Sequence, residues 1–285
     1  MPDSVDVLRA VLADMGPVVV AFSGGADSAF LAWIAANVLG PDRAPCATAV
    51  SPSLAEDELE GCRALAEAWG LSWSTVTTDE IDRMAYVVNG PDRCAHCKSA
   101  LMDALAPQAR ALGATVVLGV NLDDLGDHRP GQAAAAGAGA RFPLVEAGFT
   151  KAMVRQASRA LGLVTWDKPA GACLASRIPY GVAVTVGALG SVQRAEAALR
   201  DLGLRQLRVR HHGDVARVEV EPAELEQAFR LRDQVSAAVR SAGYAYVALD
   251  LDGFRSGSLN EVLGARAARQ SGETGARAAR RGGPT

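Results

Sequence analysis

Long apolar runs, an excess of basic charge and an export signal are all absent from this 285-residue chain. Hydrophobic residues make up 49% of it, yet no uninterrupted run approaches the roughly 20 residues that cross a bilayer. Residues 1–14 carry Asp3, Asp6 and Asp14 in place of the basic flank and apolar core of a signal peptide. We therefore expect a cytoplasmic protein without a membrane segment.

Charge of one sign is also lacking, because 29 basic residues nearly balance 32 acidic ones and leave a net charge of −3. No global positive field would draw such a chain onto nucleic acid. Lysine is especially scarce and occurs only as Lys98, Lys151 and Lys168. This composition disfavours a nucleic-acid partner.

Cysteine is sparse, with five residues, an odd number in a chain without an export signal. That argues against a disulfide framework and favours metal binding or thiol chemistry. Cys46 falls in an expected strand and Cys62 on an expected helix, which indicates core positions for both. The remaining three lie in glycine- and proline-punctuated segments: Cys94 and Cys97 in NGPDRCAHCK, and Cys173 in GACLASRIPYG.

Short β-branched runs alternate with helical patterns from about residue 17 to residue 166. The expected strands cover residues 18–22, 44–50, 73–77 and 116–120, and the expected helices cover 26–39, 54–69, 98–112 and 150–161. Such alternation is typical of βαβ units. We therefore expect an α/β fold, a parallel sheet with helices on both faces.

The alternation breaks at DKPAGACLASRIPYG, residues 167–181, which fits neither helical nor strand periodicity. Beyond it, helices over 189–202 and 222–242 and strands over 206–211, 216–221 and 244–251 predict a smaller α+β domain. The end of the chain is rich in Ala, Arg and Gly, which predicts disorder. We expect a first domain over 1–166, a linker over 167–181, a second domain over 182–264 and a disordered tail over 265–285.

The run SGGADS, residues 23–28, lies between the first expected strand and the first expected helix. Glycines there let the backbone approach a phosphate, and the amides and dipole of the helix start supply positive potential. A Walker loop, GxxxxGK[ST], is absent, so phosphoryl transfer of that type is disfavoured. The alternative is an ordinary turn that Asp27 caps. The candidate phosphate-binding residues are Ser23, Gly24, Gly25, Asp27 and Ser28.

This SGG-x-DS run resembles the signature of the PP-loop pyrophosphatase superfamily. The resemblance implies that ATP is cleaved between its α and β phosphates, so that AMP becomes a leaving group. A loop that holds pyrophosphate leaves the α phosphorus open to a carboxylate or carbonyl oxygen. Because the superfamily contains amide-forming synthetases, tRNA thiolases and sulfate reductases, the loop alone does not choose among these reactions.

Cys94 and Cys97 form a CxxC pair at the start of an expected helix, an arrangement that holds two thiolates toward one metal or cluster. Cys173 offers a third ligand, which suits an iron–sulfur cluster with one open iron. A redox pair plus a buried cysteine fits the spacing equally well.

Further segments narrow the resemblance to the LarE family, over roughly residues 5–260. These segments are GVNLDD at 119–124, DHRPG at 127–131, EAGFTK at 146–151 with Arg155, WDKP at 166–169 and CLASRIPYG at 173–181. The LarE family sulfurates the precursor of the nickel-pincer nucleotide. The resemblance implies that a carboxylate of pyridinium-3,5-biscarboxylic acid mononucleotide is adenylated. A protein-bound sulfur then attacks, and a thiocarboxylate and AMP leave.

The same resemblance implies several residue roles. Gly119 and Asn121 join the loop in contacting ATP, and Asp27 or Asp124 helps to position Mg²⁺. The three cysteines match the branch that holds a [4Fe-4S] cluster with a transferable sulfide. In another branch, the cysteine that matches Cys173 gives up its own sulfur and becomes dehydroalanine.

Arg208 and Arg210 lie on one face of an expected strand, and arginine suits bidentate contact with a phosphate. Two surface arginines that are only solvated fit this pattern as well. The resemblance to LarE implies that the substrate's phosphate contacts these two residues and Arg255. It places Ser176, Arg177 and Glu196 in segments that line the same pocket. It also implies a homo-oligomer, an upstream carboxylase and a downstream nickel-insertion protein.

Two other functions stay open on the sequence. A PP-loop thiolase or amidating synthetase would act on tRNA or another nucleotide, but the first would need a basic face and the second a source of ammonia. A non-catalytic, ATP-gated iron–sulfur carrier would bind nucleotide without forming AMP.

Overall fold

The computed structural model describes residues 2–126, 130–169 and 171–255. The expected disordered tail, residues 265–285, lies outside them. The chain divides into an N-terminal unit, made of residues up to 175 together with 180–189, and a C-terminal unit, made of residues 176–179 and those from 190 onward. The boundaries predicted at 166/167 and 181/182 remain predictions.

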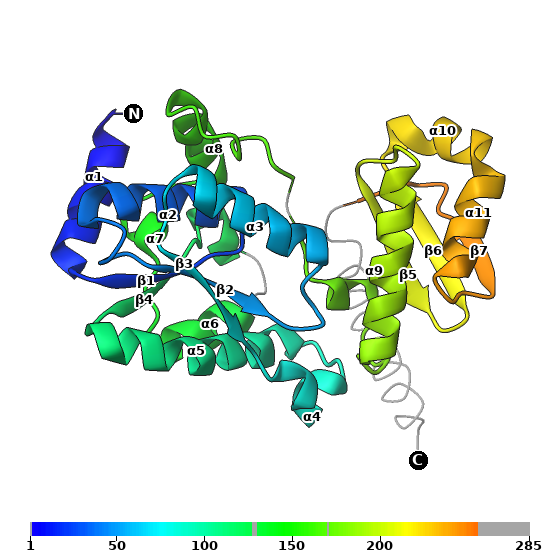
Figure 1. Cartoon of the computed structure of the whole chain (residues 1–285), viewed down its shortest axis with the longest axis horizontal. Coiled ribbons are helices and arrows are strands. Elements are labelled where there is room, and N and C mark those ends of the chain that lie inside the picture. The colour runs from blue at the N-terminus through cyan, green and yellow to red at the C-terminus, as the bar shows by residue number, and fades with distance from the viewer. Residues whose placement is uncertain (1, 127–129, 170, 256–285) are drawn as a thin grey trace, which may run out of the picture. The chain divides into compact units, whose positions relative to one another are not determined.

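The N-terminal unit is built on a parallel sheet of strands β1 (Val18–Ala21), β2 (Cys46–Val50), β3 (Trp73–Thr77) and β4 (Thr115–Leu118), in the order β3-β2-β1-β4. Helices cover both faces, as Figure 1 shows: α1 (Pro2–Met15), α2 (Ala26–Leu39), α3 (Glu56–Ala68) and α8 (Lys151–Ala160) on one side, α5 (Arg93–Leu112) and α6 (Pro130–Gly137) on the other. Short helices α4 (Met84–Val87) and α7 (Pro143–Glu146) complete it. The predicted α/β class is confirmed.

Strand β1 lies at the centre of two hydrophobic cores because its side chains alternate between the faces of the sheet. Val18 and Val20 pack with residues of α1 and α2, while Val19 packs with residues of α5. Strand order reverses beside β1, so its carboxyl end and that of β4 form the switch point where ligands bind in open α/β sheets. The run SGGADS follows β1 at this edge.

The C-terminal unit has a sheet in the order β5-β6-β7, with β5 (Leu207–His212) antiparallel to β6 (Val215–Val220) and β7 (Tyr246–Leu249) parallel to it. The unit also contains helices α9 (Val186–Asp201), α10 (Leu225–Arg230) and α11 (Arg232–Ser241). Apolar residues of these helices form one hydrophobic core with residues of the sheet. The single helix predicted over 222–242 was wrong, because the structure divides it at Leu231, which packs against that core.

Among the described residues, four short 3-10 helices lie in the connections: η1 (Glu80–Asp82), η2 (Leu122–Gly126), η3 (Leu174–Arg177) and η4 (Pro222–Glu224). None of the described helices combines the length and apolar character that a membrane crossing requires.

Candidate active site

The SGGADS loop is closed on itself by the hydroxyl of Ser28. That oxygen accepts a hydrogen bond from the Ser23 amide at 3.2 Å, lies 3.0 Å from the Ser23 hydroxyl, and donates to the Gly25 carbonyl at 3.2 Å. Gly25 is the N-cap residue of α2 and, having no side chain, caps nothing. These bonds fix the conformation of the loop, and no side chain at the N-cap position bonds to the backbone amides at the start of α2.

Two glycines allow the close packing behind this loop. A Cβ atom on Gly24, whose φ is +66°, would lie 2.9 Å from the Cys62 sulfur. A Cβ atom on Gly119, at the end of β4, would lie 2.7 Å from the Ser28 amide nitrogen. Neither position has room for a side chain, and at Gly119 the neighbouring atoms are backbone, so the end of β4 and the start of α2 touch through backbone.

Asp27 does not cap α2 but faces β4. Its Oδ1 accepts a hydrogen bond from the side chain of Asn121, through Nδ2, at 3.1 Å. The backbone N–H of Asn121 donates to Asp124 Oδ2 at 3.2 Å. Burial, together with the charge of Asp124, raises the pKa of Asp27, and the Asn121 bond opposes that rise. The buried Asn121 thus brings together the two carboxylates predicted to position Mg²⁺.

Lys151 and Arg155, at the start of α8, lie within electrostatic range of Asp27 and lower its pKa. Thr150 caps this helix by accepting a bond from the Met153 amide at 3.3 Å. Sequence reasoning quoted both cations in a motif but assigned neither to the site. The scarcity of lysine was the signal that could have found Lys151.

The three candidate cysteines all belong to the N-terminal unit. Cys94 and Cys173 are exposed, whereas Cys97 is partly buried, and its burial, aided by Cys173, raises its pKa to about 12. Within residues 2–126, 130–169 and 171–255, no three His, Cys, Asp or Glu side chains stand close enough to hold a metal ion. The thiols therefore share one electrostatic environment without forming a ligand set.

A buried polar network borders these cysteines at the ends of β2 and β3. The Ser51 hydroxyl bonds to Glu80 Oε1, and the Ser53 hydroxyl lies 2.6 Å from the Tyr86 hydroxyl. The backbone carbonyl of Ser53 accepts a hydrogen bond from the Leu174 backbone amide at 2.9 Å, which anchors the segment after Cys173. Sequence reasoning missed this network, because its members come from separate, unremarkable segments.

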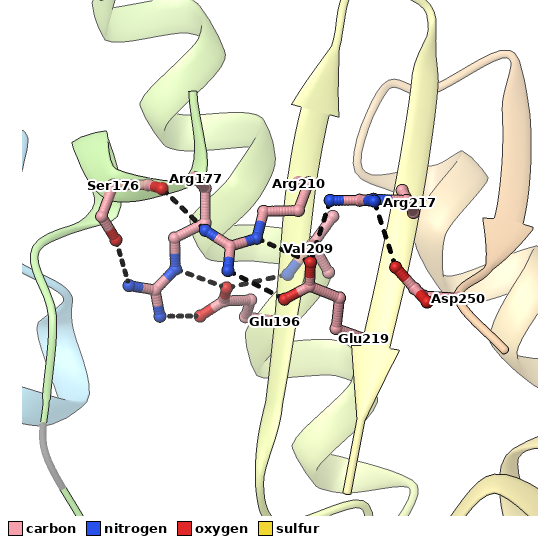
Figure 2. A network of polar contacts seen from close by, with 8 residues as sticks. All are labelled: Ser176, Arg177, Glu196, Val209, Arg210, Arg217, Glu219 and Asp250. Atoms are coloured by element: carbon pink, nitrogen blue, oxygen red, sulfur yellow. Dashed lines mark hydrogen bonds and ion pairs between the residues drawn. The ribbon is translucent and has the colours of Figure 1, made fainter. Parts of the chain in front are cut away.

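The C-terminal unit holds a buried network of arginine–glutamate pairs, drawn in Figure 2. Arg177 donates to Glu196 through Nε and Nη2 at 2.8 and 2.9 Å, and Arg210 donates to Glu219 through the same atoms at 3.0 and 2.9 Å. Arg210 Nη1 also donates to the Ser176 carbonyl at 2.8 Å. Four predicted substrate-binding residues, Ser176, Arg177, Glu196 and Arg210, are thus brought together.

Glu219 and Arg217, which extend this network to Asp250, were not predicted. The signal lay in the strand pairing, since Arg208 faces Glu219 and Arg210 faces Arg217 across β5 and β6. Such cross-strand pairs cannot be read before the register is known.

Arg208 differs from Arg210 in its partners. Its guanidinium lies over the Phe254 ring, 4.7 Å from the centroid, and in the described chain it pairs with no carboxylate. Burial, with the charges of Arg177 and Arg210, lowers its pKa to about 10. Arg255 is exposed and pairs with Asp252 at 3.2 Å. Of the three arginines predicted to bind the substrate's phosphate, Arg208 is therefore the one that has no carboxylate partner in the described chain.

Comparison with known proteins connects these sites to a family. The family model described as NAD synthase matches residues 2–110. The chain is 38% identical to the pyridinium-3,5-bisthiocarboxylic acid mononucleotide synthase of Lactiplantibacillus plantarum over 257 residues, which cover 90% of this chain and 93% of the relative. This chain belongs to the LarE family. It is an ATP-dependent enzyme, and the PP-loop of a LarE protein implies ATP with Mg²⁺.

Other relatives are uncharacterised. One from Synechocystis is 45% identical over 259 residues, covering 90% of this chain and 96% of its own length. Another, from Methanocaldococcus jannaschii, is 23% identical over 240 residues, covering 84% and 91%. The LarE resemblance thus extends over both units of the chain.

Proposed function

We propose that this protein is a sulfurtransferase that uses ATP to convert a carboxylate of a pyridinium mononucleotide into a thiocarboxylate. The observation that carries the proposal is the 38% identity to a named pyridinium-3,5-bisthiocarboxylic acid mononucleotide synthase across nearly all of both chains. The proposed substrate is pyridinium-3,5-biscarboxylic acid mononucleotide, and the products are the thiocarboxylate, AMP and pyrophosphate.

The N-terminal unit carries the ATP step. The Ser23–Ser28 loop and the start of α2 bind the β and γ phosphates, and Gly119 keeps the end of β4 against the loop. Asp27 and Asp124, joined through Asn121, position Mg²⁺. A carboxylate oxygen of the substrate attacks the α phosphorus, and the bond from that phosphorus to the bridging oxygen breaks, so that pyrophosphate leaves.

Lys151 and Arg155 belong to this step because they face Asp27 from the start of α8. ATP brings more negative charge than one Mg²⁺ neutralises, and two cations reduce what remains. Developing charge on the departing pyrophosphate is stabilised in the same way. We therefore add both residues to the phosphate-binding set.

The C-terminal unit binds the substrate's phosphate. Arg208 offers a half-buried guanidinium held over Phe254, and phosphate binding would compensate the charge that burial disfavours. Arg210 is held in place by Glu219 and adds a second guanidinium to the phosphate-binding set. Arg255 adds a third from the surface. Ser176, Arg177 and Glu196 complete this set as binding and positioning residues.

The sulfur comes to the acyl carbon from the cysteine site. Attack by a sulfur anion forms a carbon–sulfur bond, the bond to the AMP oxygen breaks, and AMP leaves with its electron pair. The residues fit an iron–sulfur cluster in donor type, since Cys94, Cys97 and Cys173 form no disulfide and interact electrostatically with one another. A [4Fe-4S] cluster held there would supply a transferable sulfide, so that no cysteine is consumed.

One experiment tests the proposal. Anaerobically reconstituted protein is incubated with ATP, Mg²⁺, sulfide and the biscarboxylated nucleotide, and the nucleotide is analysed by mass spectrometry, with ATP omitted as the control. Thiocarboxylate in excess of protein supports sulfur transfer with turnover, and thiocarboxylate limited to one equivalent, with loss of the Cys173 sulfur, supports a sacrificial cysteine instead. Unchanged nucleotide, from protein shown to bind ATP and iron, would overturn the proposed function.

Size measurement in solution tests the homo-oligomer that the family resemblance implies. The same resemblance implies a carboxylase that makes the substrate and a nickel-insertion protein that uses the product, and we keep both as proposed partners in the reaction sequence.

A further inference from the structure

Arg93 is a buried arginine that no carboxylate compensates in the described chain. It is 3% exposed, begins α5 and directly precedes Cys94. Its Nη1 donates to Asn89 Oδ1 at 2.6 Å and to the Ala175 carbonyl at 2.9 Å, both neutral acceptors. Buried arginines are almost always paired, because an uncompensated charge is expensive to remove from water.

The contrast with the other buried arginines is internal to this molecule. Arg177 and Arg210, 7% and 2% exposed, are each held by a glutamate through two hydrogen bonds. Arg93 instead lies 5.7 Å from the centroid of the Tyr180 ring. Its charge is left for something outside the described residues to compensate.

The guanidinium is held rigidly. Asn89 is fully buried and has a φ of 59°, a conformation that asparagine tolerates better than most residues. Its side chain donates to the Val182 carbonyl at 2.8 Å, and its own carbonyl accepts from the Gly181 amide at 3.0 Å. Arg93 is thus positioned by a residue that is itself fixed on two sides.

Hydrogen-bond donors remain on Arg93 after these contacts. In the part of the chain that the structure describes, its Nε and Nη2 donate no hydrogen bond, yet neither is sealed from solvent. Arg93 directly precedes Cys94, and its bond to the Ala175 carbonyl ties it to the segment two residues after Cys173. Because arginine keeps its charge in proteins, a positive guanidinium lies next to the segments that carry these two exposed thiols.

We propose that Arg93 is the anion-holding residue of the cysteine site, where its guanidinium binds an anionic sulfur species such as hydrosulfide next to Cys94 and Cys173. Charge-assisted hydrogen bonds from a fixed, desolvated guanidinium are the interactions that favour a small anion over a neutral molecule. The identity of the anion rests on the proposed function, whereas the preference for an anion rests on the geometry alone.

Two alkylating reagents of similar size, one anionic and one neutral, test this preference. Iron-free, reduced full-length protein is treated with iodoacetate, an anion, or with neutral iodoacetamide, and the rates at Cys94 and Cys173 are followed by peptide mass mapping. Arg93→Gln should slow iodoacetate relative to iodoacetamide by about tenfold, the effect of losing one charge-assisted contact. Arg93→Lys should keep most of the preference for the anion.

The ratio of the two rates separates anion binding from other effects. A changed thiol pKa or a disturbed fold alters both rates together, so the ratio stays fixed. Arg63→Gln, on the exposed side of α3, is the matched control and should behave as the wild type. An unchanged ratio in Arg93→Gln would overturn the inference and leave Arg93 a structural residue that ties Asn89 to Ala175.

The assay needs neither ATP nor the pyridinium nucleotide, so its outcome is independent of the proposed function. Where sulfur transfer is observed, Arg93→Gln should also raise the KM for sulfide about tenfold while the KM for ATP stays unchanged. Equal effects on both constants would contradict a role in holding the sulfur anion.

Discussion

Arg210 and Glu219 lie on adjacent antiparallel strands and are joined by two hydrogen bonds, while both side chains are almost fully buried, at 3% and 2% exposure. Two positions earlier on the same strand, Arg208 has the Phe254 ring as its partner. The arginines of one short motif therefore have different roles. One is fixed within the fold, and the other is available to a ligand.

Arg208→Gln should weaken binding of the substrate without weakening the fold. Burial and two neighbouring arginines lower the pKa of Arg208, so its charge opposes folding at neutral pH, and removing it should leave the Tm at or above that of the wild type. The KM for the nucleotide should rise at least tenfold, because a charge-assisted phosphate contact is lost. Thermal unfolding measures the Tm, and steady-state kinetics measure the KM.

Arg210→Gln should instead destabilise the C-terminal unit by about 1–3 kcal/mol, because the buried Glu219 carboxylate loses two hydrogen bonds and keeps the one from Arg217. Denaturant unfolding measures the difference. The double variant Arg210→Gln/Glu219→Gln should recover part of the loss. Equal stability of Arg208→Gln and Arg210→Gln would refute the distinction between the two residues.

Gly119→Ala should weaken ATP binding by about tenfold or more. The added Cβ would lie 2.7 Å from the Ser28 amide nitrogen, which is backbone and can move only if the start of α2 moves. Overpacking of this kind costs about 1–3 kcal/mol. Gly137→Ala is the control, since a Cβ atom there meets nothing within 4 Å. Isothermal titration with ATP and Mg²⁺ should give wild-type affinity for the control alone, and normal binding by Gly119→Ala would contradict the backbone contact.

Asp27→Asn should lose the Mg²⁺ dependence of ATP binding and gain stability in the absence of ligand. Burial raises the pKa of Asp27, so its ionised form is unfavourable in the fold, and the neutral amide keeps an oxygen for the Asn121 bond. The Tm at neutral pH should therefore rise. ATP titrations with and without Mg²⁺ measure the first effect. If ATP binding by the variant depends on Mg²⁺ as it does in the wild type, Asp27 does not position the metal.

Most helices and strands could be predicted from the periodicity of the sequence. Strand 73–77 and helix 26–39 were predicted with the bounds that the structure has, because alternation and a helical apolar stripe set them. Helix α5 was expected at Lys98 but begins at Arg93, since Gly90, Pro91 and Asp92 suggested a longer loop. The CxxC pair is consequently inside the first turns of α5, and Arg93 is a helical residue.

Partners across the fold were beyond the sequence. Arg93 was not predicted as a site residue, because its environment is set by its hydrogen bonds to Asn89 and Ala175. Glu219 was not predicted, because its position opposite β5 depends on the register of β5 against β6. Both residues are charged and buried, which no local pattern predicts. The residues of the proposed phosphate loop, by contrast, could be named together from the sequence, because they are contiguous along the chain, and their binding role stays a prediction.

The three cysteines should contribute equally to iron binding. Anaerobic reconstitution with iron and sulfide, followed by absorbance and iron analysis, should give cluster in the wild type and at most traces in Cys94→Ala, Cys97→Ala and Cys173→Ala, because three thiolates are needed. Cys46→Ala, at a buried site, is the control and should reconstitute normally. Full reconstitution of Cys94→Ala and Cys97→Ala would favour a sacrificial Cys173.

The C-terminal unit should become less stable as the pH falls from 7.5 to 5. Burial lowers the pKa of both His211 and His212, and for His212 the charges of Arg217, His211 and Arg210 add to the effect. Because the folded pKa values lie below the unfolded value of 6.5, the unfolded chain binds more protons in this range, so stability is fully present above pH 6.5 and is lost as the pH falls.

Replacing both histidines by asparagine should flatten this pH dependence, since neither side chain then titrates. Tyr244 faces His211 at 3.2 Å and holds its ring in place, so the single variant His212→Asn separates the electrostatic effect from lost packing. A slope that persists in the double variant would assign the acid sensitivity to other groups.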